Sequence, residues 1–194
     1  YGNVEWTMRD LEYDAATGKL YGVMFVKQFD EEGKMKKIAQ LVEINPANGE
    51  LTSLALYEGV TPLGLALNPT GGFYLVAEKI SSSFKYVPVV YSIANDETLT
   101  ISQLFMDDAI SYKGNSSHTC FMYGGALYFF SGGQCLTFDI TAQKGTLKGS
   151  LSGSFAGLSF EASTEDGTPA GTKATDNRVL VSKTYYGDAM GMAP

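Results

Sequence analysis

Apolar residues along the chain fall into short runs, and each run ends at a group of turn-forming residues such as glycine, asparagine, proline or serine. Segments 20–26 and 127–130 are apolar at nearly every position, so both faces of each segment must be buried. Short apolar runs between Gly-rich turns are typical of β-strands rather than helices. The pattern therefore predicts an all-β chain in which some strands lie between two other layers.

Two sequence features recur at a nearly constant spacing. Segments 17–23, 70–76 and 124–130 each combine a turn with an apolar strand, and they place tyrosines at positions 21, 74 and 128, with separations of 53 and 54. Segments 41–51, 90–99 and 137–147 form a second set, with leucines at 51, 99 and 147, each 48 positions apart. Such a repeat indicates structural units of about 50 residues.

Each unit contains four expected strands separated by turns. The expected strands are 7–13, 20–27, 38–44 and 51–56 in the first unit, 63–68, 73–78, 87–93 and 99–105 in the second, and 117–123, 126–130, 134–140 and 146–151 in the third. Four strands in a repeat of this length are typical of a β-propeller blade. A plain β-sandwich is the alternative fold.

Segments 13–21 and 42–51 carry a family resemblance. They resemble extracellular β-propellers of the broad NHL, YVTN and quinoprotein-like group, as found in secreted proteins of Bacteroidota. The resemblance implies a fold and an extracellular, cell-surface or periplasmic location, but it indicates no ligand. The Trp-Asp pair of another propeller class is absent, since Trp6 is followed by Thr7.

The array of repeats is incomplete. We expect one propeller segment over 1–194, with units at about 7–56, 63–105 and 117–151 and a partial fourth unit at 156–183. The fourth unit has an inner strand near 156–160, a polar insert at 162–177 and a second strand at 178–183, and we expect no outer strands after it. Propellers close with about 4–8 blades. About three and a half blades therefore need partners from the same gene, another chain or self-association, and because the chain begins with Tyr1 we expect a partial or processed product.

Composition excludes several partners. The net charge is −7, and the only basic cluster is 34–37, so a nucleic-acid surface is not expected. No apolar run approaches the ~18 residues of a transmembrane helix.

The candidate binding face carries the long loops 28–37, 79–86 and 105–117, because function concentrates on loops held by a rigid scaffold. The inner strands begin on this face, just before the matched positions Leu11, Leu65, Thr119 and Leu158, and Arg9, Asp10 and His118 are the polar residues there. These residues could hold a small anion or a sugar hydroxyl, or they could satisfy one another. Loop aromatics that could contact a ligand are Phe29, Phe84, Tyr86 and Tyr112.

Catalytic motifs are weak. With one histidine, His118 and Cys120 do not make up a zinc set, and the acidic pairs at 107–108 and 165–166 do not match a calcium loop. Segment 149–153 resembles a nucleophile elbow but has Leu151 at the nucleophile position. We therefore expect no metal and no cofactor. The sequence favours a non-catalytic propeller that binds a protein or glycan; a hydrolase or lyase with part of its site in other blades, and a structural subunit of an envelope complex, are the alternatives.

The two cysteines are expected to be reduced and buried. Counting residues across the turns at 124–125 and 131–133 places Phe129 between Cys120 and Cys135 in the sheet. Two strand spacings of ~4.8 Å separate them too far for a disulfide. Segment 115–117 is an N-glycosylation sequon that would act only in a eukaryotic secretory host.

Overall fold

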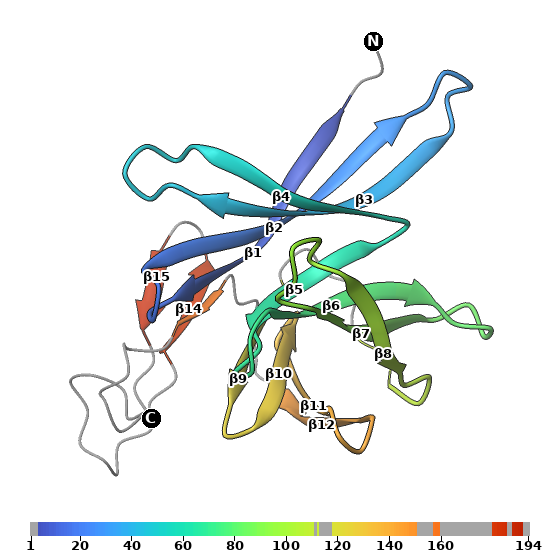
Figure 1. The fold of residues 1–194 in the computed structure, drawn as a ribbon. Coiled ribbons are helices and arrows are strands. Elements are labelled where there is room, and N and C mark those ends of the chain that lie inside the picture. Colours follow the sequence, from blue (N-terminus) through green and yellow to red (C-terminus); the bar gives the residue numbers. More distant parts are fainter. Residues whose placement is uncertain are drawn as a thin grey trace.

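The chain folds into antiparallel strands (Figure 1). The structure is a computed structural model that describes residues 4–110, 112 and 118–149, and the backbone alone of strand residues 150, 157–159, 180–185 and 188–191. These residues contain no helix, and hence none that could cross a membrane.

Three sheets have four strands each, ordered as in the chain. The first sheet contains β1 (Glu5–Asp14), β2 (Lys19–Phe29), β3 (Met35–Ile44) and β4 (Leu51–Glu58). The second sheet contains β5 (Thr61–Leu67), β6 (Phe73–Ile80), β7 (Tyr86–Ile93) and β8 (Ile101–Met106). The third sheet contains β9 (His118–Tyr123), β10 (Ala126–Ser131), β11 (Gln134–Asp139) and β12 (Lys144–Ser150). The predicted all-β class and its twelve strands are confirmed.

The hairpins on the predicted long-loop face have longer strands and shorter loops than expected. The β2–β3 hairpin pairs as far as Phe29 with Met35, which leaves only residues 30–34 as a loop. Asp30 closes this loop by accepting hydrogen bonds from the amides of Glu32 and Lys34. Similarly, β6 and β7 pair as far as Ile80 with Tyr86. The hairpins thus extend as two-stranded ribbons beyond the core.

A smaller sheet follows the third sheet and corrects the expected end of the fourth unit. It contains β13 (Gly157–Ser159), β14 (Leu180–Tyr185) and β15 (Asp188–Gly191), in that order. The expectation that no strand follows the second one is therefore wrong. Segment 188–191 has no β-branched or aromatic residue to mark it as a strand, and it is defined by its pairing with β14. The expected insert at 162–177 lies outside the described residues.

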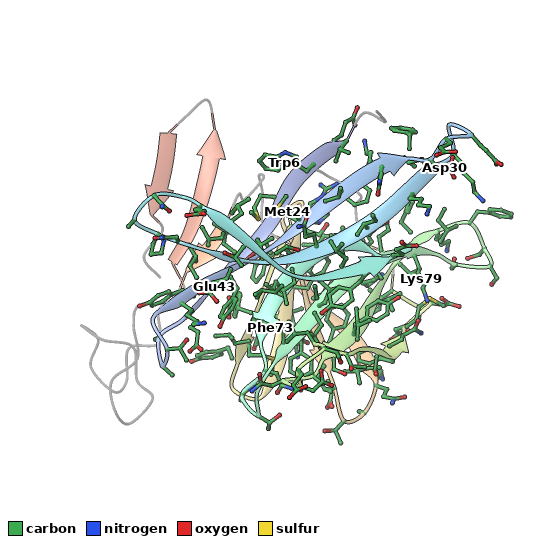
Figure 2. The ribbon with its side chains drawn as sticks, turned by 45° about the horizontal axis from the view of Figure 1, so that its top comes forward. Trp6, Met24, Asp30, Glu43, Phe73 and Lys79 are labelled. Carbon is green, nitrogen blue, oxygen red and sulfur yellow. The ribbon has the colours of Figure 1, made fainter. Side chains whose placement is uncertain are left out.

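The sheets stack face to face. Between the first and second sheets, one core cluster joins Val23 and Leu41 to Leu65 and Leu75. Phe73, labelled in Figure 2, packs here with its ring edge-on to a tyrosine of β2, at a centroid distance of 4.9 Å. A second cluster packs Val76 and Val90 of the second sheet against Leu127, Phe129 and Phe138 of the third. This explains why the second strands are apolar on both faces.

The first strands of the sheets lie together: β1 contacts β5, β5 contacts β9, and β1 also contacts β9. Gly64 in β5 allows the closest approach, because a Cβ atom there would lie 2.8 Å from the Sγ atom of Cys120 in β9. The sheets spread outward from these first strands without forming a closed ring (Figure 1).

Strand pairing defines equivalent positions in the three sheets. Tyr21, Tyr74 and Tyr128 all lie on second strands. The next residue of each second strand pairs with Leu11, Leu65 and Cys120, respectively. The sequence alignment had matched Thr119 to the two leucines, and this is wrong by one position. The turns between first and second strands differ in length, at 15–18, 68–72 and 124–125, so a constant offset does not hold.

The three equivalent residues differ sharply in exposure. Leu11 is 50% exposed, whereas Leu65 is 0% and Cys120 is 2% exposed. Leu65 and Cys120 face the preceding sheet, while the same face of the first sheet has no four-stranded neighbour among the described strands. We call this surface the open face. Its exposed apolar residues include Trp6, Leu11, Tyr13, Leu51 and Leu56 (Trp6 is labelled in Figure 2).

The cysteine pairing also differs from expectation by one position. Cys120 pairs with Phe129 as predicted, but Phe129 pairs with Leu136 and Cys135 pairs with Phe130. Both cysteines are free; Cys120 is buried, but Cys135 is only partly buried, contrary to the prediction. Because directly paired residues share a face, the two thiols lie on opposite faces of the sheet. The sequon at 115–117 lies outside the described residues.

Candidate functional site

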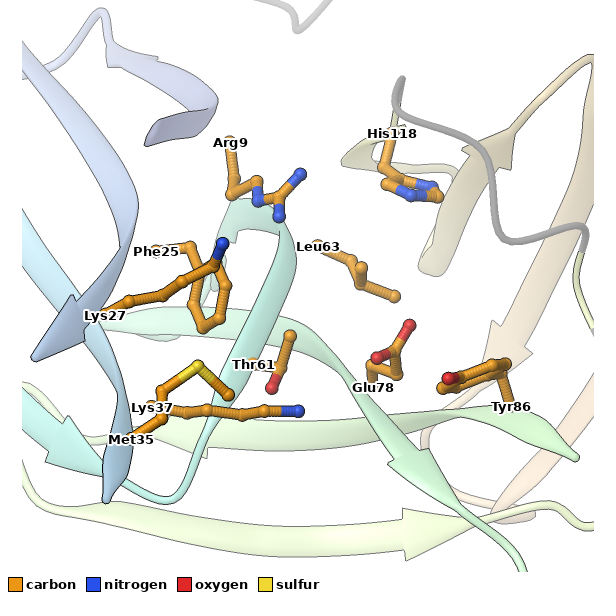
Figure 3. A pocket seen from close by; sticks show the side chains of 10 residues that line it. All are labelled: Arg9, Phe25, Lys27, Met35, Lys37, Thr61, Leu63, Glu78, Tyr86 and His118. Carbon is orange, nitrogen blue, oxygen red and sulfur yellow. The ribbon is translucent and has the colours of Figure 1, made fainter. Parts of the chain in front are cut away.

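A pocket of about 480 Å³ opens where the three four-stranded sheets meet (Figure 3). Its walls come from first, second and third strands, and from both hairpin ribbons. The lining residues are Arg9, Phe25, Lys27, Met35, Lys37, Thr61, Leu63, Glu78, Tyr86 and His118. The pocket therefore lies on the face that carries loops 30–34 and 81–85.

Arg9 is directed into the pocket by an irregularity in β1. The register between β1 and β2 shifts between Met8 and Asp10, which leaves Arg9 as the extra residue of a bulge. Bulges redirect side chains and are frequent near functional sites. The guanidinium carbon of Arg9 lies 5.3 Å from the ring centre of Phe25, a cation–π geometry. Its Nε atom is buried and finds no hydrogen-bond partner among the residues that the structure describes. Leu63 occupies the corresponding shifted position in β5.

Two lysines stand side by side in the wall formed by the first sheet. Lys27 of β2 and Lys37 of β3 are directly paired across the strands. Like charges at such positions repel each other. Lys27 is balanced by Glu5, whose Oε2 atom lies 3.2 Å from its Nζ atom. For Lys37, the described part of the chain supplies no ion-pair partner.

The opposite wall is a packed polar cluster. The hydroxyl of Tyr112 donates a hydrogen bond to the carboxylate of Glu78. Burial and this carboxylate raise the pKa of Tyr112 well above its usual value. The Tyr112 ring is edge-on to His118 at 5.6 Å, and the imidazole stacks on Phe129 at 5.8 Å. These contacts hold Glu78 and His118 in place at the pocket surface.

The seven residues proposed from the sequence are placed differently, and Phe29, at the end of β2, is not among the lining residues. Arg9, His118 and Tyr86 line the pocket. Tyr112, which we expected on an accessible loop, is only 6% exposed and supports the wall from behind. Phe84 is 90% exposed in loop 81–85 and is not among the lining residues.

Asp10 faces away from the pocket, toward the neighbouring first strands. Its Oδ2 atom accepts hydrogen bonds from the amides of Leu65 and Cys120, both at 3.0 Å, and Oδ1 accepts one from the Thr119 hydroxyl at 2.9 Å. Burial raises the pKa of Asp10 to about 7, against the opposing effect of these hydrogen bonds. Two residues along β1, Glu12 accepts the amide of Leu67 in the same manner, and burial raises its pKa to about 7.

Sequence reasoning missed the residues contributed by the strand ends. Phe25, Lys27, Lys37 and Glu78 line the pocket, yet they lie in segments that we had assigned as strands or as undivided loops. Strand periodicity could have identified two of these residues, since Phe25 and Lys27 lie on the same face of β2 as the core residue Val23. The missing information was how far each hairpin continues past the core.

The site combines cations with hydrogen-bonding groups. Arg9, Lys27 and Lys37 face a single carboxylate, Glu78, in a chain whose net charge is −7. Among the described residues, no group of three or more His, Cys, Asp or Glu side chains is placed to hold a metal ion. The arrangement can bind an acidic group electrostatically and can hydrogen-bond to hydroxyls.

No protein-family model matches the chain, and no curated protein matches it either. The resemblance to NHL, YVTN and quinoprotein-like propellers therefore stays a prediction.

Proposed function

We propose that this chain is a β-propeller segment that binds a glycan or a protein, without catalysis, in the pocket on its long-loop face. Four-stranded sheets that stack in sequence order around adjacent first strands support the propeller interpretation. Each such sheet corresponds to one blade. The family resemblance supports an extracellular, cell-surface or periplasmic location.

The observation that carries the proposal is the composition of the pocket wall. Strands of all three four-stranded sheets converge to form one cavity, and the first sheet places Arg9 and Lys37 on its surface, neither of which is ion-paired within the described residues. Buried charges in proteins are usually paired, so a cavity lined by unpaired cationic groups favours an acidic ligand. The cavity volume lies within the ~300–1,000 Å³ range typical of ligand pockets.

A scaffold role is a second candidate, favoured by the open face. Leu11 of the first sheet is half exposed, whereas the equivalent residues Leu65 and Cys120 are buried in the other two sheets. Large exposed apolar patches mark interaction surfaces. A further blade, from the same gene, another chain or a second copy, would cover this face and place the protein in a larger assembly.

The test is binding to arrayed glycans and immobilised polysaccharides by the wild type, by the double variant Arg9→Met, Lys37→Met and by Lys36→Met. Lys36 is exposed, adjacent in sequence and outside the pocket, so its variant is the control for charge loss. We expect binding by the wild type and the control, and loss of binding in the double variant at unchanged melting temperature. Equal binding by all three would place the site elsewhere, and turnover of a bound polysaccharide would favour the enzyme alternative.

A further inference from the structure

The two sides of the pocket differ in charge. Figure 3 shows Arg9, Lys27 and Lys37 on one side, and Glu78 with Tyr86 on the other. No ion pair joins the two sides, since neither of the two ion pairs among the described residues involves Glu78. The pocket is therefore polarised, and a complementary ligand is acidic at one end only.

The cationic side is arranged to receive an anion. Lys37 stands directly across from Lys27, and Glu5 balances only the latter. An acidic group between Lys37 and Arg9 would relieve this repulsion and would supply hydrogen-bond acceptors to the guanidinium, which is held over Phe25. Arginine is well suited to this because its planar donors match two oxygens of a carboxylate or sulfate.

The opposite side disfavours a ligand that is anionic throughout. Glu78 would repel a second acidic group, but its carboxylate accepts hydrogen bonds from hydroxyls. Thr61, directly paired with Glu78 in the sheet, and Tyr86 add hydroxyl groups nearby. Hydroxyl groups on a small ring would donate hydrogen bonds to this side, and the apolar side chains of Leu63 and Phe25 line the same pocket.

We propose that the pocket recognises an acidic sugar, with its carboxylate or sulfate ester between Arg9 and Lys37 and its hydroxyls toward Glu78 and Thr61. This inference rests on the proposed binding function and specifies its ligand class. It assigns opposite selectivity to the two walls: the cationic wall selects for the acidic group, and Glu78 selects against simple anions and polyanions.

The experiment measures affinities by ligand-observed NMR for glucuronate, glucose 6-sulfate, glucose and inorganic sulfate at one ionic strength. We expect glucuronate or glucose 6-sulfate to bind at least tenfold more tightly than glucose and than inorganic sulfate; the better of the two identifies the acidic group. Lys37→Met and Arg9→Met should each lower that affinity about tenfold, and Lys36→Met should leave it unchanged. Glu78→Gln, which retains an acceptor for Tyr112, should weaken sugar binding and strengthen sulfate binding.

Three results would overturn the acidic-sugar assignment. Sulfate binding as tightly as the sugars would indicate an anion site only, glucose binding equally would indicate a neutral-sugar site, and no binding of any probe would exclude this class. If array binding still depends on Arg9 and Lys37 in any of these cases, the proposed function stands and only the ligand class is wrong. If array binding is also insensitive to them, both proposals fail.

Discussion

The Oδ2 atom of Asp10 lies 3.0 Å from the backbone nitrogen of Cys120, although the two residues are 110 positions apart. The same oxygen accepts the amide of Leu65, so one carboxylate joins the first strands of three sheets. A first strand has one edge without a neighbouring strand, and buried amides on that edge need acceptors. Asp10, with Glu12 bonded to Leu67, supplies them.

Asp10→Ala should destabilise the fold strongly. It removes acceptors from the amides of Leu65 and Cys120 and from the Thr119 hydroxyl, and a buried donor left unsatisfied costs about 1–3 kcal/mol. Loss of a buried charge offsets part of this, so we expect the free energy of unfolding to fall by about 2–4 kcal/mol, measured by urea denaturation. The exposed Asp108→Ala is the control and should change it by less than about 0.5 kcal/mol. Equal effects of the two substitutions would contradict the joining role.

Stability should decrease as pH rises from about 4 to 7. Burial raises the pKa values of Asp10 and Glu12 to about 7, so the folded chain retains protons that the unfolded chain has released above its ordinary carboxyl pKa. When the native state binds more protons, the free energy of unfolding falls with rising pH. Glu12→Gln keeps an acceptor for Leu67 but cannot titrate, so its pH profile should be flatter. The exposed Glu31→Gln should retain the wild-type slope, and a wild-type stability that rises over this range would refute the assignment.

The repeat was predictable because it rests on local signals. Tyrosines follow turns at a regular spacing, and each second strand is apolar on both faces because a sheet packs on either side. The sequence did not show which residues of the first strands correspond to one another. The lengths of the turns vary, and the bulge at Arg9 has no sequence signature. As a result, the predicted positions of Thr119 and Cys135 in the sheet were each wrong by one residue. A shift of one residue along a strand places a side chain on the opposite face of the sheet.

The pocket was only partly predictable for a related reason. Arg9 and His118 were identified from their positions at the start of first strands, and both line the cavity. Lys37 and Glu78 reach it because the hairpins extend beyond the core, which the polar composition of those segments does not reveal. Asp10 looked equivalent to a site residue, but its side chain lies on the opposite side of the bulge from Arg9, among the first strands.

The two thiols should differ in reactivity. Cys120 is 2% exposed and burial raises the pKa of its thiol, whereas Cys135 is only partly buried. A thiol reagent at pH 8 should therefore modify Cys135 in the native protein and reach Cys120 only after unfolding, as followed by mass spectrometry of the peptides. Denatured, non-reduced monomer should show two free thiols. A count of zero would mean that the two cysteines form a disulfide, which would contradict their placement on opposite faces of the sheet.

The open face should behave as surface in this chain, although its residues resemble core. Leu11 and Leu65 are equivalent by strand pairing, but Leu11 is 50% exposed and Leu65 is fully buried. Leu65→Ala should lower the free energy of unfolding by about 2–5 kcal/mol, as deletion of buried leucine atoms does. Leu11→Ala should lower it by less than about 1 kcal/mol in the isolated chain, since half of its side chain already contacts water. If a further blade covers the open face in the complete assembly, Leu11→Ala should there become as destabilising as Leu65→Ala, measured by the same urea titration on the assembled protein. A small effect of Leu11→Ala in both forms would mean that no blade packs on this face.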